Sequence, residues 1–303
     1  MTLGRGGHIS SMIQNTPNFR DILFLSSDRD ADSLQVAENI RSRFKDIRYE
    51  HYHYRFSETN KLFEKYKSKV DFILMDLGVS TYQLKTPNRG FSFGEDITSL
   101  DMRMDQSDSF SAYNFINDLD ESVISSVLEA YSEERLAKKI ARQIKEYRQD
   151  VGRIETTQQL KNIIVGCLNK NYDRKNDVLA RVFQAIRIFV NDELNELCYG
   201  IENAYGLLRP QTGVLAVITF HSLEDRIAKF GLDKSNYLNS NEVGYISKCL
   251  SISTNMGKNL LQVGQAGCER MWSDVKPLVF PSEEEIIRNP SSRSAKLRVA
   301  IKN

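Results

Sequence analysis

Asp76 and His221 each stand at the end of a predicted buried strand, where a side chain can bind a ligand or carry a proton. The apolar run 70–75 leads into Asp76, and the run 213–220 leads into His221. Such runs are typical of parallel strands, and ligands of open α/β sheets bind where these strands end. We expect Asp76 to touch a ligand. His221 is either a proton carrier or substrate contact, or part of a helix-capping turn, since residues 222–225 resemble a capping box.

The glycine-rich segment 4–8 precedes a predicted helix and offers a second ligand-binding feature. Glycine lets a backbone approach a ligand closely, and a helix N-terminus favours a carboxylate or phosphate. The spacing does not match a dinucleotide fingerprint, because Ile9 stands where the third glycine is needed. Asp28 follows the predicted strand 21–27, about 20 residues after the glycine segment, which is the place of a ribose-binding acid in a nucleotide-binding βαβ unit. The alternative is that Asp28 lies at the capped start of a helix.

The order of the predicted elements indicates an α/β fold with a helical insertion. Strands and helices alternate up to Asp76, as in a doubly wound sheet. Residues 106–174 then show helical periodicity and almost no strand signal. We therefore predict one discontinuous sheet domain, residues 1–105 and 175–303, and an inserted all-helical domain, residues 106–174.

Periodicity predicts four further features of the sheet domain. Residues 178–197 have the apolar stripe of one helix, and residues 201–208 form a second helix. Segments 277–280 and 297–302 are expected to form an antiparallel pair that closes the sheet. Segment 234–267 has no strong period, so we expect irregular structure there.

Charge and cysteine content narrow the function classes. The 303 residues include 41 Lys+Arg and 40 Asp+Glu, so a nucleic-acid surface must come from local clustering. The predicted helix 133–148 has such a cluster, and it is either a phosphate-binding surface or an ordinary solvated face. Its one-signed stripe consists of Arg135, Lys138, Lys139 and Arg142. Four cysteines without a CxxC pair indicate a reducing compartment and no metal site, and no apolar run is long enough to span a membrane.

Seven motifs, spread in order over nearly the whole chain, resemble those of the RsmH (MraW) family. They are TLGRGGH (2–8), DLGVS (76–80), RGFSF (89–93), LDMRMD (100–105), FQAIRIFVNDEL (183–194), FHSLEDR (220–226) and RSAKLR (293–298). This family comprises S-adenosylmethionine-dependent methyltransferases that make N4-methylcytidine in small-subunit ribosomal RNA. The resemblance implies a class I methyltransferase sheet, which is Rossmann-like, with a helical insertion. Met271, Trp272 and the divergent segment 234–267 are similar to the mitochondrial animal branch.

The resemblance also implies roles for individual residues, with S-adenosylmethionine as the cofactor. The glycine loop would face the methionine end, Asp28 would hold the ribose, and Phe56 would lie near the adenine. The full set of expected cofactor contacts is Gly6, Gly7, His8, Asp28, Phe56, Asp76 and Gln83.

The expected chemistry needs acceptors for the N–H bonds of the cytosine amine, because its lone pair is delocalised into the ring. The candidates for the catalytic site are Asp76, Asp101 and His221. The target cytidine must be unstacked or already single-stranded to reach them. The basic helical insertion and the basic tail would bind the RNA, through Arg135, Lys138, Lys139, Arg142, Arg293 and Lys296.

The expected partner is small-subunit ribosomal RNA or an assembling small subunit, without a membrane or a metal, and the sequence does not indicate the oligomeric state. Family analogy implies the mitochondrial matrix, with the cytoplasm as the alternative. Family members have a further segment and a first strand before the glycine loop, so we expect a truncated form whose first strand is missing. Two other functions stay open. One is a nicotinamide-dependent oxidoreductase, and the other is a non-catalytic RNA-binding ribosome-assembly factor with a compromised cofactor site.

Overall fold

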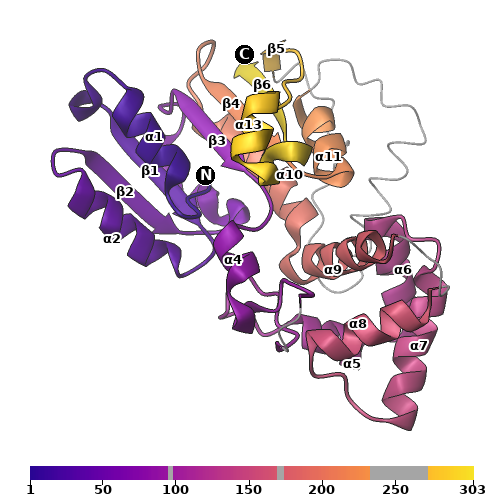
Figure 1. The fold of residues 1–303 in the computed structure, drawn as a ribbon. Helices are drawn as coiled ribbons and strands as arrows, with labels where there is room; N and C mark the ends of the chain where they lie inside the picture. Colours follow the sequence, from indigo (N-terminus) through magenta and orange to yellow (C-terminus); the bar gives the residue numbers. More distant parts are fainter. Residues whose placement is uncertain (95–97, 169–173, 233–271) are drawn as a thin grey trace. The chain divides into compact units, whose positions relative to one another are not determined.

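The computed structural model describes four stretches of the chain, residues 1–94, 98–168, 174–232 and 272–303. Their residues fall into two compact units, whose elements are labelled in Figure 1. The described parts of the first unit are residues 1–78, 194–232 and 272–303. The described parts of the second unit are residues 79–94, 98–168 and 174–193, so this unit begins before residue 106. The predicted irregular segment 234–267 lies outside the described residues.

The first unit begins with a strand–helix–strand arrangement, as the sequence predicts. β1 (Leu23–Asp28) and β2 (Arg48–His53) pair in parallel, and α2 (Ser33–Arg43) connects them. α1 (Gly7–Asn15) precedes β1. Apolar side chains from all four elements share one core, which includes Ile9, Ile13, Phe24, Val36, Ala37, Ile40 and Tyr49. Burial of these side chains stabilises the position of the glycine loop that leads into α1.

The second sheet of this unit has the strand order β3-β4-β6-β5. β3 (Phe72–Asp76) and β4 (Val214–Thr219) are parallel, with Asp76 opposite Ile218. β6 (Lys296–Lys302) runs antiparallel between β4 and β5 (Trp272–Val275). The run of buried residues in β4 fits a strand covered on both faces.

Of the two segments predicted to form an antiparallel pair at the end of the sheet, 297–302 is confirmed as a strand and 277–280 is not a strand. β6 matches segment 297–302, but its edge partner is β5. Segment 277–280 contributes a single bridge, Val279 to Leu297. It begins with Pro277 and is followed by Pro281, and a proline has no N–H to donate to a strand ladder.

The single helix predicted over 178–197 is also wrong. α9 (Lys175–Asn191) ends before Asp192, and α10 (Glu193–Leu207) begins after it. Asp192 has φ +53°, and this left-handed conformation interrupts the helix. The apolar period continues across the interruption, so periodicity alone could not show it.

The second unit is helical, and the predicted helical periodicity is confirmed for each of its larger helices. Its other helices are α4 (Thr81–Lys85), α5 (Ala112–Asp118), α6 (Glu121–Ser132), α7 (Ala137–Asp150) and α8 (Thr157–Gly166). α6 packs against both α7 and α9. Fully buried Ile124, Leu128, Ile140, Ile144 and Phe189 form its core. No helix in the described ranges is long and apolar enough to cross a membrane.

Residues 1–4 run between the two sheets of the first unit. The amine of Met1 donates a hydrogen bond to the carbonyl of Leu74 at 2.7 Å, and the Ser27 hydroxyl donates to the carbonyl of Met1 at 3.1 Å. The N–H of Asp76 donates to Thr2 Oγ1 at 2.9 Å. The chain therefore enters α1 from between the strands that end in Asp28 and Asp76.

Candidate active site

Gly6 forms the sharp turn that starts α1. Its φ of +78° is left-handed, and its N–H donates to the carbonyl of Leu3 at 2.8 Å. A Cβ at this position would lie 2.9 Å from Ile40 Cδ1 and 3.2 Å from Val36 Cγ1 of α2. In the described part of the chain, no side-chain hydrogen bond caps the start of α1. Glycine is therefore needed for both the backbone conformation and the close approach to α2, and the first N–H groups of α1 are left for another acceptor.

Asp28 fixes the residues that precede this turn. Its Oδ2 accepts hydrogen bonds from the N–H groups of Leu3, at 3.1 Å, and Gly4, at 2.9 Å. Its Oδ1 accepts the N–H of Asp30 at 3.0 Å. The helix-cap alternative is wrong, because α2 begins at Ser33, after Asp32. Asp28 is thus an anchor of the glycine loop at the carboxyl end of β1, and ribose binding stays a prediction.

Asp76 and His8 form a pair at the carboxyl end of β3. His8 Nε2 lies 3.2 Å from Asp76 Oδ2, and the hydrogen bond between them is the main cause of the raised pKa of His8. The second oxygen, Asp76 Oδ1, is buried and has no hydrogen-bond partner in the described part of the chain. A buried carboxylate oxygen without a donor is unfavourable by about 1–3 kcal/mol. The arrangement therefore suits a ligand that brings an N–H or O–H to Oδ1.

The turn after β4 lies beside the turn after β3. The N–H of Leu77 donates to the carbonyl of Ile218, and Gly78, with φ +82°, would place a Cβ 3.9 Å from the ring of Phe220. His221 follows Phe220 and is largely buried. These contacts bring the backbone beside His221 close to the end of the Asp76 strand.

His221 caps α11 (Ser222–Leu232), although through other residues than the sequence suggested. Its Nδ1 accepts the N–H of Glu224 at 3.4 Å, and its Nε2 lies 3.1 Å from Glu224 Oε1 without hydrogen-bond geometry. Glu224 Oε2 accepts the N–H of Phe220 at 2.8 Å. The capping box expected over 222–225 is wrong, because the carboxylate of Asp225 instead accepts hydrogen bonds from Lys296, at 3.0 Å, and Arg298, at 2.7 Å.

Asp101 belongs to the helical unit and is held in a rigid loop. Both of its oxygens accept hydrogen bonds from the guanidinium of Arg103, each at 2.8 Å. Gly90 packs against the same loop, since a Cβ there would lie 2.4 Å from the carbonyl oxygen of Ser99 and 2.8 Å from the N–H nitrogen of Asp101. The carboxylate of Asp101 thus has a structural partner of its own.

Gln83 also belongs to the helical unit, and it is buried in a capping box at the start of α4. Its Oε1 accepts the N–H of Ser80 at 2.8 Å, while its own N–H donates to Ser80 Oγ at 3.2 Å. The side chain therefore orders the turn after Gly78, and a cofactor contact by Gln83 stays a prediction.

Phe56 begins the 3-10 helix η2 (Phe56–Leu62), and one face of α10 fixes it. A Cβ on Gly200 would lie 3.1 Å from the Phe56 ring. Asn203 donates to the carbonyl of Phe56 at 2.8 Å, and Glu196 accepts from both the N–H and the hydroxyl of Ser57. Sequence reasoning missed these α10 residues. The signal was present, because residues 196, 200 and 203 have the spacing of one helix face.

The basic residues proposed for RNA differ in their surroundings. Arg135 lies just before α7 and the other three of the group lie on α7, and all four are exposed. Among the described residues, Arg135 and Lys138 make no hydrogen bond or ion pair. Lys139 donates to the carbonyl of Cys167 at 2.7 Å, and Arg142 Nε lies 3.7 Å from Glu146 Oε1. In the tail, Arg293 is exposed, whereas Lys296 is paired with Asp225.

The site thus has carboxylates at the ends of two strands and a glycine turn before a helix. Comparisons with known proteins identify the protein family to which a chain with this site belongs. The chain belongs to the MraW methylase family, whose model matches residues 1–303. It is 39% identical to the 12S rRNA N(4)-cytidine methyltransferase METTL15 of Bos taurus, an alignment that covers 100% of this chain and 77% of the relative. Its human counterpart is 37% identical with the same coverage. The ribosomal RNA small subunit methyltransferase H of Methylobacillus flagellatus is 38% identical, over 99% of this chain and 86% of that protein.

Proposed function

We propose that this protein transfers a methyl group from S-adenosylmethionine to the exocyclic N4 of a cytidine in small-subunit ribosomal RNA. The observation that supports this reaction most directly is the buried Oδ1 of Asp76 at the carboxyl end of β3, which has no hydrogen-bond partner among the described residues. An amine N–H is the donor that such an oxygen lacks. Family membership and the names of the relatives agree with this reaction. The oxidoreductase alternative has no comparable support.

The residues of the first unit fit the cofactor. The uncapped start of α1 and the turn at Gly6 would receive its carboxylate end, and Asp28 would receive the ribose hydroxyls. Phe56, His8 and Asp76 complete our proposed set in this unit, and a cofactor contact by Gln83 stays a prediction. When bound, S-adenosylmethionine supplies a methyl group on a positively charged sulfonium that is already activated for displacement.

Asp76 is our first choice for activating the cytosine amine. Its Oδ1 would accept one N–H bond of the amine, which makes the nitrogen lone pair more available for attack. Methylation of the amine releases one proton, and the Asp76 carboxylate would take it. His8, 3.2 Å away and half exposed, would then pass this proton to solvent. His221 is a second candidate acceptor, and Asp101 is a weaker one because Arg103 holds both of its oxygens.

We assign RNA recognition to the helical residues 106–174 and to the basic tail. Exposed Arg135 and Lys138, which have no partner among the described residues, support this assignment, because unpaired arginine and lysine side chains are the groups that neutralise phosphates. For the fold, we infer a class I methyltransferase sheet into which this helical segment is inserted. The parallel pairs β1–β2 and β3–β4, followed by the antiparallel β6, support that inference.

For the site of action we propose the mitochondrial matrix. Similarity to animal 12S rRNA enzymes supports this location. The bacterial relatives, which are about as similar, support the cytoplasm as the alternative. Fractionation of cells that express the natural protein would decide between them, since the protein and its methylated RNA must occur in the same fraction.

A methyl-transfer assay tests the proposed function. The protein is incubated with isotopically labelled S-adenosylmethionine and unmethylated small-subunit RNA or small subunits, and the RNA is digested to nucleosides for mass spectrometry. We expect labelled N4-methylcytidine at a single position. RNA that is bound but never labelled, under conditions in which the cofactor is shown to bind, would refute the proposal and favour the non-catalytic assembly factor.

A further inference from the structure

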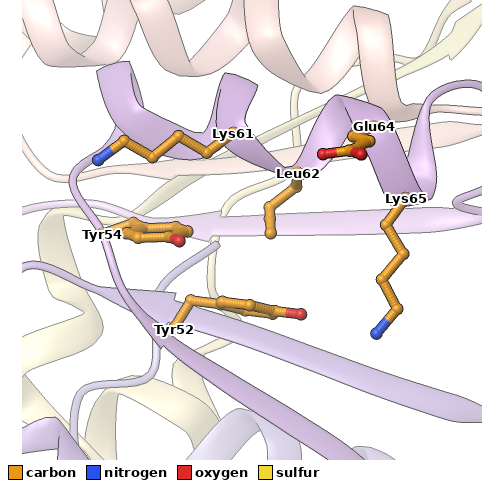
Figure 2. A pocket seen from close by; sticks show the side chains of 6 residues that line it. All are labelled: Tyr52, Tyr54, Lys61, Leu62, Glu64 and Lys65. Atoms are coloured by element: carbon orange, nitrogen blue, oxygen red, sulfur yellow. The ribbon is translucent and has the colours of Figure 1, made fainter.

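A hollow of about 500 Å³ lies on the first unit, between β2 and the segment that follows it. Figure 2 shows Tyr52 and Tyr54 on one side and Leu62 pointing toward them from η2. The ammonium groups of Lys61 and Lys65 lie at opposite ends. The lining residues are Tyr52, Tyr54, Lys61, Leu62, Glu64 and Lys65. None of them has a role in the proposed methyl transfer, and the volume suits a group the size of one nucleotide.

The aromatic side of the hollow is held rigidly. The rings of Tyr52 and Tyr54 are stacked, with centroids 5.4 Å apart and planes 20° apart. The Tyr52 hydroxyl donates to Glu50, which also accepts from Tyr66 at 2.7 Å and from Lys65 at 2.8 Å. These hydrogen bonds, the one from Lys65 foremost, lower the pKa of Glu50 to about 2. Glu50 is thus a carboxylate at any physiological pH and keeps the Tyr52 ring in place.

The charged groups of the hollow are suited to a nucleic acid, which has phosphates for the lysines and amino groups on its bases for a carboxylate. Lys61 Nζ lies 4.9 Å from the centre of the Tyr54 ring and 2.6 Å from Glu58. Lys61 and Lys65 are both more than half exposed, so their ammonium groups have N–H donors left for a phosphate. Glu64 is exposed, and its carboxylate has no partner among the described residues. A free carboxylate beside an aromatic surface can accept the amino N–H of a base.

We propose that this hollow binds one unpaired nucleotide of the RNA substrate, outside the site of methyl transfer. The base would lie against the stacked rings of Tyr52 and Tyr54 and against Leu62, with its amino group toward Glu64. The neighbouring phosphates would contact Lys61 and Lys65. Bases with an exocyclic amine are favoured over uracil, which has none. Only a single-stranded or unstacked nucleotide can enter, because the bases of a duplex cover one another's faces.

This inference rests on the proposed function for the identity of the RNA, but its test does not need methyl transfer. The affinity of the whole protein for single-stranded fragments of small-subunit RNA is measured by fluorescence anisotropy for the wild type and for Tyr54→Leu. Loss of one aromatic contact should weaken binding about tenfold. Tyr54→Phe keeps the ring and should bind like the wild type. An unchanged affinity in Tyr54→Leu would overturn the proposal.

A second pair of variants tests the phosphate contact. Lys61→Gln should reduce the slope of log affinity against log salt by about 0.7, the value for one phosphate of a single strand. Lys45→Gln is the control, because Lys45 is exposed on the same unit, does not line the hollow and has no partner in the described ranges. Equal slopes for the two variants would contradict the assignment.

The adenosine half of the cofactor has the same chemistry as a nucleotide, so its binding is measured in parallel. Titration calorimetry with S-adenosylmethionine should give the same Kd for Tyr54→Leu, Lys61→Gln and the wild type. A weakened cofactor affinity with unchanged RNA affinity would overturn the proposal and assign the hollow to the cofactor. A wild type that binds RNA through the hollow and transfers no methyl group would refute only the proposed function.

Discussion

Replacing Gly6 with alanine tests the geometry of the loop that leads into α1. The left-handed backbone of Gly6 is unfavourable for alanine by about 1–2 kcal/mol. The new Cβ would also lie 2.9 Å from Ile40 Cδ1 and 3.2 Å from Val36 Cγ1, and such overpacking is unfavourable by about 1–3 kcal/mol. Together these effects predict a loss of about 3 kcal/mol in the free energy of unfolding of the first unit.

Two neighbouring glycines provide matched controls. Gly4 has φ +51° but no atom within 4 Å of the position of an added Cβ. Gly4→Ala should therefore lower the free energy of unfolding only through the unfavourable backbone conformation, by about 1–2 kcal/mol. Gly7 is the first residue of α1, has an ordinary φ and also has free space around it. Gly7→Ala should leave stability unchanged or raise it by up to about 1 kcal/mol. The predicted loss of unfolding free energy is therefore largest for Gly6→Ala, smaller for Gly4→Ala and absent for Gly7→Ala.

Urea unfolding measures this order, with fluorescence of Trp272 as the signal. Trp272 is the one tryptophan of the chain, and it is buried in β5 of the first unit. Cofactor affinity by calorimetry should weaken in the same order, because the loop is part of the proposed cofactor site. A Gly6→Ala protein as stable as the wild type, or a Gly7→Ala protein as damaged as Gly6→Ala, would refute the reasoning.

Three further predictions concern other parts of the site. Asp101 and Arg103 form an ion pair of two hydrogen bonds, and both side chains are mostly buried. Asp101→Asn breaks this pair and should lower the free energy of unfolding by about 2 kcal/mol. A large loss of methylation rate with unchanged stability would assign Asp101 to catalysis instead. The methylation rate should rise with pH through an apparent pKa above 6.5, because protonated His8 cannot take over the proton that Asp76 receives from the amine. His8→Gln should remove this limb of the profile, and a flat wild-type profile would contradict the prediction. The stabilising effect of the His8–Asp76 pair has the opposite trend, being complete below pH 6.5 and lost as the pH rises through the raised pKa of His8. Arg135→Gln and Lys138→Gln should each reduce the salt dependence of RNA binding by about 0.7–0.9 in log–log slope, whereas Lys45→Gln should not.

Local patterns were sufficient to predict the elements that hold the strand-end residues. The apolar runs before Asp28 and Asp76 form β1 and β3, and both carboxylates lie at the carboxyl ends of those strands. The glycine segment forms the predicted turn into α1. These features depend on a few adjacent residues, and adjacent residues are visible in one sequence.

Features that depend on distant contacts were not predictable in the same way. Glu224, rather than Asp225, closes the turn at His221, because Lys296 and Arg298 of β6 hold the Asp225 carboxylate from more than 70 positions away. The edge strand β5 likewise depends on pairing with β6. A single sequence does not show such pairings.

Alternation along β2 is visible in the sequence, and it determines which side chains reach the hollow. Alternation along β2 places His51 on one face of the strand, where it contacts Ser26 and Ser33. The intervening Tyr52, with Tyr54 just beyond the strand, lines the hollow on the other face. The period of two along a strand therefore places Tyr52 on the face opposite His51.

The most direct test of the central claim is the single-turnover rate of methyl transfer by Asp76→Ala at saturating S-adenosylmethionine. Loss of both oxygen acceptors should slow transfer to the cytidine by about 10²–10³-fold. Asp76→Asn keeps one acceptor without the charge, so its rate should fall between those of the alanine variant and the wild type. The unfolding free energy of each variant is measured alongside, to separate loss of chemistry from loss of fold. An Asp76→Ala protein that methylates N4 of cytidine at the wild-type rate would contradict the role given to this carboxylate.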